Sequence, residues 1–148
     1  MTSTASGWIL PDLQDEDSAG FWEGAARGEL CMQRCGDCGQ RRMPPRPMCP
    51  HCQSLRTEWE PMSGRGTVWS FIVPHPPLLP AYAEVAPYVA ILVSLDEDPN
   101  LRIGGNLVTS ADGPIDEIDP ATIQIGEPVR VVFTQVDDVA LPRWVRAG

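Results

Sequence analysis

Lysine is absent from this chain of 148 residues, so all 11 of its positive charges come from arginine. No run of about 18 apolar residues is present, which argues against a membrane-spanning helix. The first 20 residues lack a basic segment followed by a long apolar stretch, so they do not have the pattern of a secretory signal. We therefore expect a cytoplasmic protein with no membrane span.

The sequence motifs of several common enzyme classes are missing as well. The chain has no G-x-S-x-G nucleophile elbow, no phosphate-binding P-loop, no dinucleotide fingerprint and no H-E-x-x-H motif. Acidic runs at 15–17 and 96–98 fall at an expected helix start and strand end, where they are typical of caps and solvated turns. The residues by themselves therefore indicate no catalytic group and favour a binding or accessory module.

Two Cys-x-x-Cys pairs separated by ten residues form the most specific pattern in the chain: Cys35 with Cys38, and Cys49 with Cys52. Each pair can present two thiolates to one ion, and two pairs complete a tetrahedron. Four thiolates leave no open position for water, so we expect one structural zinc ion. Iron and a thiol redox pair are the alternatives, and no βαβ pattern of the kind that surrounds such a redox pair is seen.

The fifth cysteine and the two histidines are given other roles. Cys31 is expected to be a buried, unligated thiol, because it precedes the first pair on a presumed strand. His51 lies inside the second pair, where a better-spaced cysteine competes with it for the ion. His75 falls in a proline-rich loop and is expected to pack there rather than to act as a base.

The hydrophobic pattern predicts a mainly β protein. Acidic residues crowd the start of a short helix at 15–29, and Gly28 can end it. After the turn at 63–67, five β-rich runs follow, at 68–73, 88–95, 101–108, 129–136 and 141–145. Five strands with unequal loops and no long helix favour a small barrel such as an OB-fold.

These elements divide the chain into three parts. We expect an N-terminal segment with the short helix at 1–29, a rubredoxin-like zinc ribbon at 30–62, and a five-stranded OB-fold barrel with a C-terminal tail at 63–148. The adjacent glycines at 104–105 suggest a bulge or bend of the kind that small barrels need to close.

Charge is unevenly distributed between these parts. Residues 27–65 carry a formal charge of +3, from seven arginines and four acids, and the remainder carries −12, which sums to the net −9 of the chain. OB-fold barrels bind single-stranded nucleic acids through a positive groove with aromatic platforms. Here acids outnumber arginines in the barrel segment, so we do not expect nucleic acid as a ligand.

An apolar loop at 74–87 contains five prolines. The prolines make this loop stiff, and it is more apolar than a loop that only connects two strands needs to be. Both properties favour a role in binding a partner. The candidates for a partner surface are Trp22, Leu78, Leu79, Tyr82 and Trp144. For two of them there is a plain alternative: Trp22 can pack on the ribbon, and Trp144 can close the barrel.

Taken in order, these motifs resemble the acyl-CoA-associated zinc-ribbon and OB-fold proteins known as domain of unknown function 35. The resemblance covers nearly all of residues 15–146. The residues that carry it, besides the four cysteines, are Phe21, Trp22, Leu30, Gln33, Arg34, Gly39, Pro44, Pro45, Arg46, Pro50, Gly64, Gly66, Val68 and Ser70.

The resemblance implies a non-catalytic subunit that accompanies a thiolase-superfamily enzyme and helps it to bind and process an acyl-CoA. It favours a thiolase-like lipid-transfer-protein aldolase as the partner, with retro-aldol cleavage of a β-hydroxyacyl-CoA as in steroid side-chain degradation. A thiolase or a hydroxymethylglutaryl-CoA synthase as partner, and a free-standing acyl-CoA-binding module, stay open. Arg41, Arg42 and Arg46 become candidates for the CoA phosphates, since arginine suits bidentate phosphate contacts. They can alternatively pair with local acids or with the partner.

Overall fold

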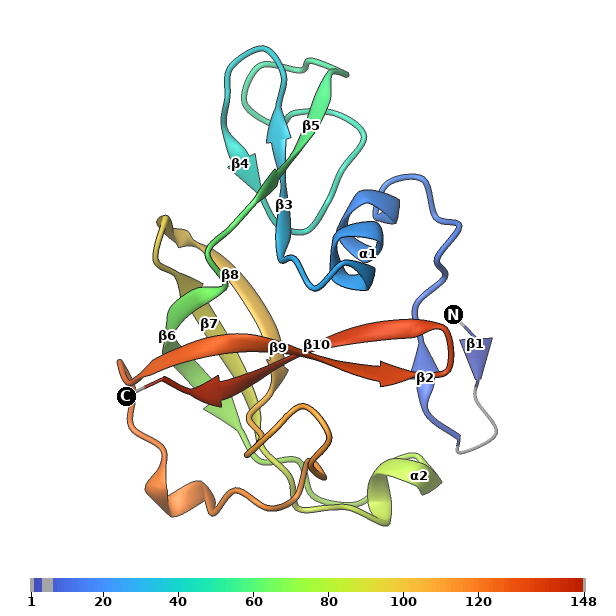
Figure 1. Cartoon of the computed structure of the whole chain (residues 1–148), viewed down its shortest axis with the longest axis vertical. Coiled ribbons are helices and arrows are strands. Elements are labelled where there is room, and N and C mark those ends of the chain that lie inside the picture. Colours follow the sequence, from blue (N-terminus) through green and yellow to red (C-terminus); the bar gives the residue numbers. More distant parts are fainter. Residues whose placement is uncertain (1, 4–6, 148) are drawn as a thin grey trace.

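The computed structural model describes residues 2–3 and 7–147 and contains three sheets (Figure 1). The elements, in chain order, are β1 (Thr2–Ser3), β2 (Ile9–Leu10), α1 (Ala19–Ala26), β3 (Cys31–Cys35), β4 (Arg41–Arg42), β5 (Thr57–Pro61), β6 (Arg65–Ile72), α2 (Pro80–Ala83), β7 (Ala90–Leu95), β8 (Asp98–Asn106), a 3-10 turn η1 (Pro120–Thr122), β9 (Pro128–Val136) and β10 (Val139–Arg146). No helix among these residues is long and apolar enough to cross a bilayer.

The short helix α1 occupies the middle of the expected segment 15–29. Its start is set by a turn in which the Ser18 hydroxyl donates to the Asp15 carboxylate at 2.9 Å. It ends before Gly28, which adopts a left-handed φ of +77°. Two internal glycines weaken the helix but allow close packing. A Cβ on Gly20 would overlap the Trp59 ring, and a Cβ on Gly24 would lie 2.7 Å from the Cys31 sulfur.

The ribbon is a three-stranded antiparallel sheet in the order β4-β3-β5. Strand β3 lies in its centre and pairs along its whole length with β5, from Cys31 opposite Pro61 to Cys35 opposite Thr57. The short strand β4 pairs with β3 on the other side. Because β3 leads directly into the first cysteine pair, the sheet fixes where the metal-binding turns begin.

The larger sheet contains all five strands expected for an OB-fold, in the order β10-β9-β6-β7-β8. It curls into a half-barrel (Figure 1), and its two edge strands approach each other at a bridge between Leu107 and Trp144. Gly105 belongs to this closure, since a Cβ there would lie 3.0 Å from the Trp144 ring. The bulge suggested for 104–105 is not found, because Gly104 and Gly105 pair in regular register with Leu92 and Ile91. The expected fold class, a mainly β chain with a zinc ribbon and a five-stranded OB-fold, is confirmed.

One hydrophobic cluster joins the two sheets. It includes Phe21 from α1, Leu30 and Met32 from the start of the ribbon, and the inward residues of the half-barrel, among them Val93 and Trp144. The helix α1 contacts both β3 and β10, and so covers the junction between ribbon and barrel (Figure 1). The ribbon is therefore packed onto the barrel through a shared apolar core.

Candidate metal centre and adjoining pocket

The four cysteines of the two pairs converge at the end of the ribbon. The Sγ atoms of Cys35 and Cys52 lie 3.6 Å apart, as do those of Cys38 and Cys49, and all four lie within 4.8 Å of one another. All of them are free thiols rather than disulfides. Cys35 and Cys49 are buried, whereas Cys38 and Cys52 lie on the solvent side.

This geometry fits one tetrahedral zinc ion. Zn–S bonds of about 2.3 Å place the four sulfurs of a regular tetrahedron roughly 3.8 Å apart, close to the two 3.6 Å separations. The donor set consists of sulfur alone, which suits zinc and leaves no position for a reacting water. The expectation of a single structural metal site is confirmed at these four residues.

Backbone amides stabilise the thiolate of Cys35 in the first metal-binding turn. The N–H groups of Cys38 and Asp37 both donate to the Cys35 sulfur at 3.4 Å. These two hydrogen bonds stabilise the thiolate and lower the pKa of Cys35 to about 6. A thiolate is the form that binds metal, so the turn favours the ligand state before the ion arrives.

The remaining cysteine and histidines lie outside this cluster. Cys31 is buried beside α1, and burial, followed by the nearby Glu29 carboxylate, raises the pKa of its thiol. This agrees with the expected unligated thiol. His51 and His75 are both exposed, and neither belongs to the metal-binding group. For His75 this corrects the expectation of a packed residue: it projects from the proline-rich loop.

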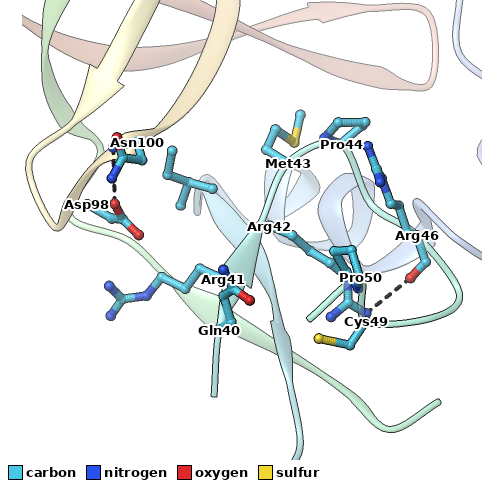
Figure 2. A pocket seen from close by; sticks show the side chains of 11 residues that line it. Gln40, Arg41, Arg42, Met43, Pro44, Arg46, Cys49, Pro50, Asp98 and Asn100 are labelled. Carbon is cyan, nitrogen blue, oxygen red and sulfur yellow. Dashed lines mark hydrogen bonds between the residues drawn. The ribbon is translucent and has the colours of Figure 1, made fainter. Parts of the chain in front are cut away.

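A cavity of about 310 Å³ adjoins the metal centre (Figure 2). One wall is the arginine- and proline-rich connector between the two cysteine pairs, and the other is the start of β8. The lining residues are Gln40, Arg41, Arg42, Met43, Pro44, Arg46, Cys49, Pro50, Asp98, Asn100 and Leu101. All three arginines proposed for CoA therefore border one cavity, but their environments differ.

Arg41 is held by an acidic residue. Its Nε and Nη2 donate to the two carboxylate oxygens of Glu60 at 2.8 and 2.9 Å. This bidentate hydrogen bond raises the pKa of Arg41 and lowers that of Glu60. Figure 2 shows the Arg41 side chain directed away from Arg42 and Arg46. Much of its hydrogen-bonding capacity is therefore already used within the chain.

Arg42 is a buried anchor with one free donor. Its Nε donates to the Gln33 side-chain oxygen at 2.6 Å, and its Nη2 donates to the Thr57 hydroxyl and the Arg46 carbonyl. The Nη1 group is buried and has no hydrogen-bond partner in the described parts of the chain. A buried guanidinium N–H without an acceptor is costly, so this donor is the strongest local indication of a missing acceptor.

Gln33 is a site residue whose role the sequence did not reveal. Its side chain is only 3% exposed, and its oxygen accepts from both the Arg42 Nε and the Arg46 backbone N–H, the latter at 2.7 Å. It thereby fixes the connector against β3. Arg46 itself is exposed, and its guanidinium has no hydrogen bond or ion pair with a described residue. In the sequence, the role of Gln33 was indicated by its place in the Q-R-C part of the family motif.

The expected partner-surface residues are distributed over different surroundings. Leu79 is 53% exposed, and Leu78 beside it is half-buried. Tyr82 packs edge-on against Trp8 with ring centroids 4.6 Å apart, and its hydroxyl accepts from the Ile9 N–H. Trp22 is half-buried and packs edge-on against Phe21.

Trp144 does not belong on that surface. Its side chain is 0% exposed and lies in the core cluster where the half-barrel closes. The indole packs against Gly105 of β8, next to the bridge between Leu107 and Trp144. The alternative interpretation, that it closes the barrel, replaces the interface assignment for this residue.

A four-cysteine ribbon packed onto an OB-fold half-barrel defines a class of small zinc-ribbon/OB-fold proteins. Within that class, two family models match this chain: the rubredoxin-like zinc ribbon domain of ChsH2 at residues 22–58, and the C-terminal OB-fold domain of ChsH2 at residues 59–134. The chain belongs to this ChsH2 family of zinc-ribbon and OB-fold (DUF35) proteins.

Three relatives show how far the similarity extends. A probable enoyl-CoA hydratase alpha subunit of Thermomonospora curvata is 39% identical over 86% of this chain and 37% of its own length. The 3-oxo-4,17-pregnadiene-20-carboxyl-CoA hydratase alpha subunit of Mycobacterium tuberculosis is 36% identical over 92% of this chain and 40% of its own. The chain thus spans about two fifths of these curated relatives. A chain of the solved Ltp2-ChsH2(DUF35) aldolase is 36% identical, with a TM-score of 0.77, over 93% of this chain and 100% of that one.

Proposed function

We propose that this chain is a non-catalytic subunit of an acyl-CoA enzyme in which a thiolase-like partner carries the catalytic residues. The observation that carries the proposal is the similarity to the chain in the Ltp2-ChsH2(DUF35) aldolase, because it extends over all of that chain. The proposed reaction is retro-aldol cleavage of a β-hydroxyacyl-CoA, of the kind used in steroid side-chain degradation. The role of the chain is to bind the partner and to help hold the substrate.

The cavity beside the metal centre is the proposed place for the phosphates of CoA. Arg46 has an exposed, unpaired guanidinium, and Arg42, whose Nη1 is buried and unpartnered, lines the same cavity. Both donors are positioned by Gln33. Arg41 contributes charge rather than hydrogen bonds, because Glu60 already occupies its guanidinium. Arginine is well suited to such phosphate contacts.

We keep four residues as proposed partner contacts: Leu78, Leu79, Trp22 and Tyr82. Leu79 is the strongest of them, because it is exposed on a loop that proline stiffens. Pre-ordering of a loop lowers the entropic cost of binding.

The partner is tested by affinity purification of the tagged chain from its native host, followed by co-expression with the captured thiolase-like protein. We expect the two chains to co-elute and the complex to cleave a β-hydroxyacyl-CoA. The isolated chain should show no turnover. Equal turnover by the isolated chain, or the absence of any thiolase-like protein from the complex, would overturn the proposal.

The CoA site is tested separately by calorimetric titration of the complex with CoA and with dephospho-CoA. Arg46→Gln should weaken CoA binding several-fold, whereas Arg130→Gln, which removes an exposed arginine of β9 far along the chain, should leave it unchanged. If both variants bind CoA like the wild type, the phosphates bind elsewhere.

A second candidate function is favoured by the two hydratase relatives. Both are named as alpha subunits, and this chain matches about two fifths of each. In that case the chain would serve a hydratase rather than an aldolase. Assaying the purified complex for water addition to an α,β-unsaturated acyl-CoA distinguishes the two reactions.

A further inference from the structure

A groove on the outer face of the half-barrel is not used by the metal centre or by the proposed CoA site. It has a volume of about 280 Å³ and runs across β6, β7 and β8. We call it the β6–β8 groove and define it by Trp69, Ser70, Ile72, Leu92 and Gly104. No charged residue lines it. Two of the large hydrophobic side chains left exposed in the described chain, Trp69 at 51% and Ile72 at 63%, belong to it.

The strand register creates this groove. Ser70, Leu92 and Gly104 form one row across the three strands. Neighbouring residues along each strand, such as Ile91 and Ile103, point into the core, so this row faces outward. Gly104 has no side chain, and its row is therefore open at the edge strand. A Cβ on Gly104 would lie 3.6 Å from its nearest neighbour, the Ile91 carbonyl oxygen, which is an ordinary van der Waals contact.

A β-bulge adds an aromatic wall. The register between β6 and β7 shifts between Val68 and Ser70, which leaves Trp69 as the extra residue. Bulges re-aim side chains in this way. The guanidinium of Arg102 lies over the Trp69 ring, 4.1 Å from its centroid. This contact holds the exposed indole in place and puts one positive charge beside an otherwise apolar groove.

Arg102 has an unused donor. Its Nε is buried and has no hydrogen-bond partner in the described residues, and none of the salt bridges found among them includes this side chain. A guanidinium without a salt bridge gains most from a carboxylate acceptor. The groove and this unpaired positive charge together therefore call for an occupant that combines an apolar side chain with a neighbouring negative charge.

We propose that the β6–β8 groove is a docking site for a segment of the partner protein that inserts a large apolar side chain and places an Asp or Glu carboxylate on Arg102. Tryptophan and arginine are the residue types that most often dominate binding energy at protein interfaces. The lining is apolar apart from the neighbouring Arg102, which suits an apolar side chain with an acidic neighbour. One face of the Trp69 ring is already covered by Arg102, which argues against stacking of a nucleic-acid base.

This inference deepens the proposed function and depends on the partner complex described above. The sharpest variant is Gly104→Leu, which fills the groove from a position that has room for a side chain. Arg102→Gln removes the charge. Ile125→Ser is the matched control, because it removes another exposed apolar side chain, at 62% exposure, outside the groove.

Affinity for the captured thiolase-like partner is measured by surface plasmon resonance at several salt concentrations, with the partner immobilised. We expect Gly104→Leu to weaken binding about 10-fold or more, and Arg102→Gln to weaken it and to flatten its salt dependence. Ile125→Ser should bind like the wild type. Zinc content and thermal unfolding of each lone variant show whether it is folded. If Gly104→Leu is not folded, the affinity of Arg102→Gln decides the outcome.

A second readout follows the groove directly. The chain is labelled with 5-fluorotryptophan, and the ¹⁹F signal of Trp69 is assigned from a Trp69→Phe variant. The signal should shift on addition of the partner but not on addition of acyl-CoA alone. A shift with acyl-CoA alone would make the occupant a small molecule, and loss of self-association in Gly104→Leu without loss of partner binding would make it a second copy. Either result overturns the proposal.

The two levels of proposal fail differently. If the wild-type chain binds the partner and both groove variants bind it equally well, the docking site is wrong and the proposed function stands. If the wild-type chain does not bind a thiolase-like partner at all, the proposed function fails and the docking site falls with it.

Discussion

Replacing Gln33 by leucine should be one of the most damaging single changes in the ribbon, although Gln33 does not bind the metal. Its buried oxygen accepts hydrogen bonds of 2.6 Å from the Arg42 Nε and 2.7 Å from the Arg46 N–H. Leucine leaves both donors without an acceptor beside an Arg42 that already has one unpartnered donor. At about 1–3 kcal/mol for each of these two unsatisfied donors, we expect a loss of roughly 2–6 kcal/mol.

Such a loss is a large part of the about 5–15 kcal/mol that stabilises a typical protein. In a chain of this size it corresponds to a fall of roughly 4–24 °C in the unfolding temperature. The assay is thermal and urea unfolding of the zinc-loaded chain, followed by circular dichroism. Gln124→Leu, at an exposed position, is the control and should change the stability by less than about 0.5 kcal/mol.

A double variant gives the reasoning a stricter test. Gln33→Leu combined with Arg42→Met removes the acceptor and its buried charged donor together. Replacing both partners by apolar groups should recover much of the lost stability, because no guanidinium is left unsatisfied. Two results would contradict this role of Gln33: unfolding of Gln33→Leu at the wild-type temperature, or a double variant that is less stable than the single one by the full cost of a second independent change.

Three further results are expected. Purified chain should contain about one zinc ion, as a four-thiolate site requires. Cys49→Ser should lose metal and stability, whereas Cys31→Ser should keep the metal. Full retention of zinc in a Cys35→Ser/Cys49→Ser variant would contradict the site. Because the hydrogen bond from Arg41 lowers the pKa of Glu60, their pair stabilises the fold above the unfolded carboxyl pKa and loses this effect as pH falls through the lower folded value. Arg41→Gln should therefore cost up to about 1 kcal/mol at pH 7, and urea unfolding should show wild type and variant converging in acid. Trp144→Ala should cost about 3–5 kcal/mol in the lone chain, whereas Leu79→Asp should leave its unfolding temperature nearly unchanged and reduce co-elution with the partner; the opposite pattern would place Leu79 in the core.

The strands and the metal site could be predicted from the sequence, because each depends on a local pattern of residues. The run at 88–95 is apolar and rich in β-branched residues, and it contains β7, an interior strand between β6 and β8. The spacing of Cys35, Cys38, Cys49 and Cys52 specifies a tetrahedral site without knowledge of the rest of the fold. The expected fifth strand was too short, since β10 runs over Val139–Arg146 and includes Pro142 on an edge strand, where proline is tolerated.

The different roles of the three arginines were not legible, because they depend on long-range partners. Arg41 and Arg42 are neighbours on β4, so their side chains point to opposite faces of the ribbon. One meets Glu60 and the other meets Gln33. Alternation along a strand predicts that they diverge, but not which acceptor each meets. Trp144 was ambiguous for the same reason: its burial depends on Leu107 and Gly105, which lie almost 40 residues earlier in the chain.

The shared core of ribbon and half-barrel links the metal to the whole molecule. Leu30 and Met32 are fully buried in the same cluster as Val93 and Trp144, so the two sheets do not have separate interiors. A ribbon that loosens when its ion is withdrawn would expose apolar surface belonging to the barrel as well. Metal occupancy and barrel order are then thermodynamically coupled, and a calorimetric scan should show a single transition whose midpoint rises with free zinc. By the same coupling, a protein that binds the ordered barrel more tightly than the loosened one should raise the affinity of the ribbon for zinc, and withdrawal of zinc should weaken the binding of that protein.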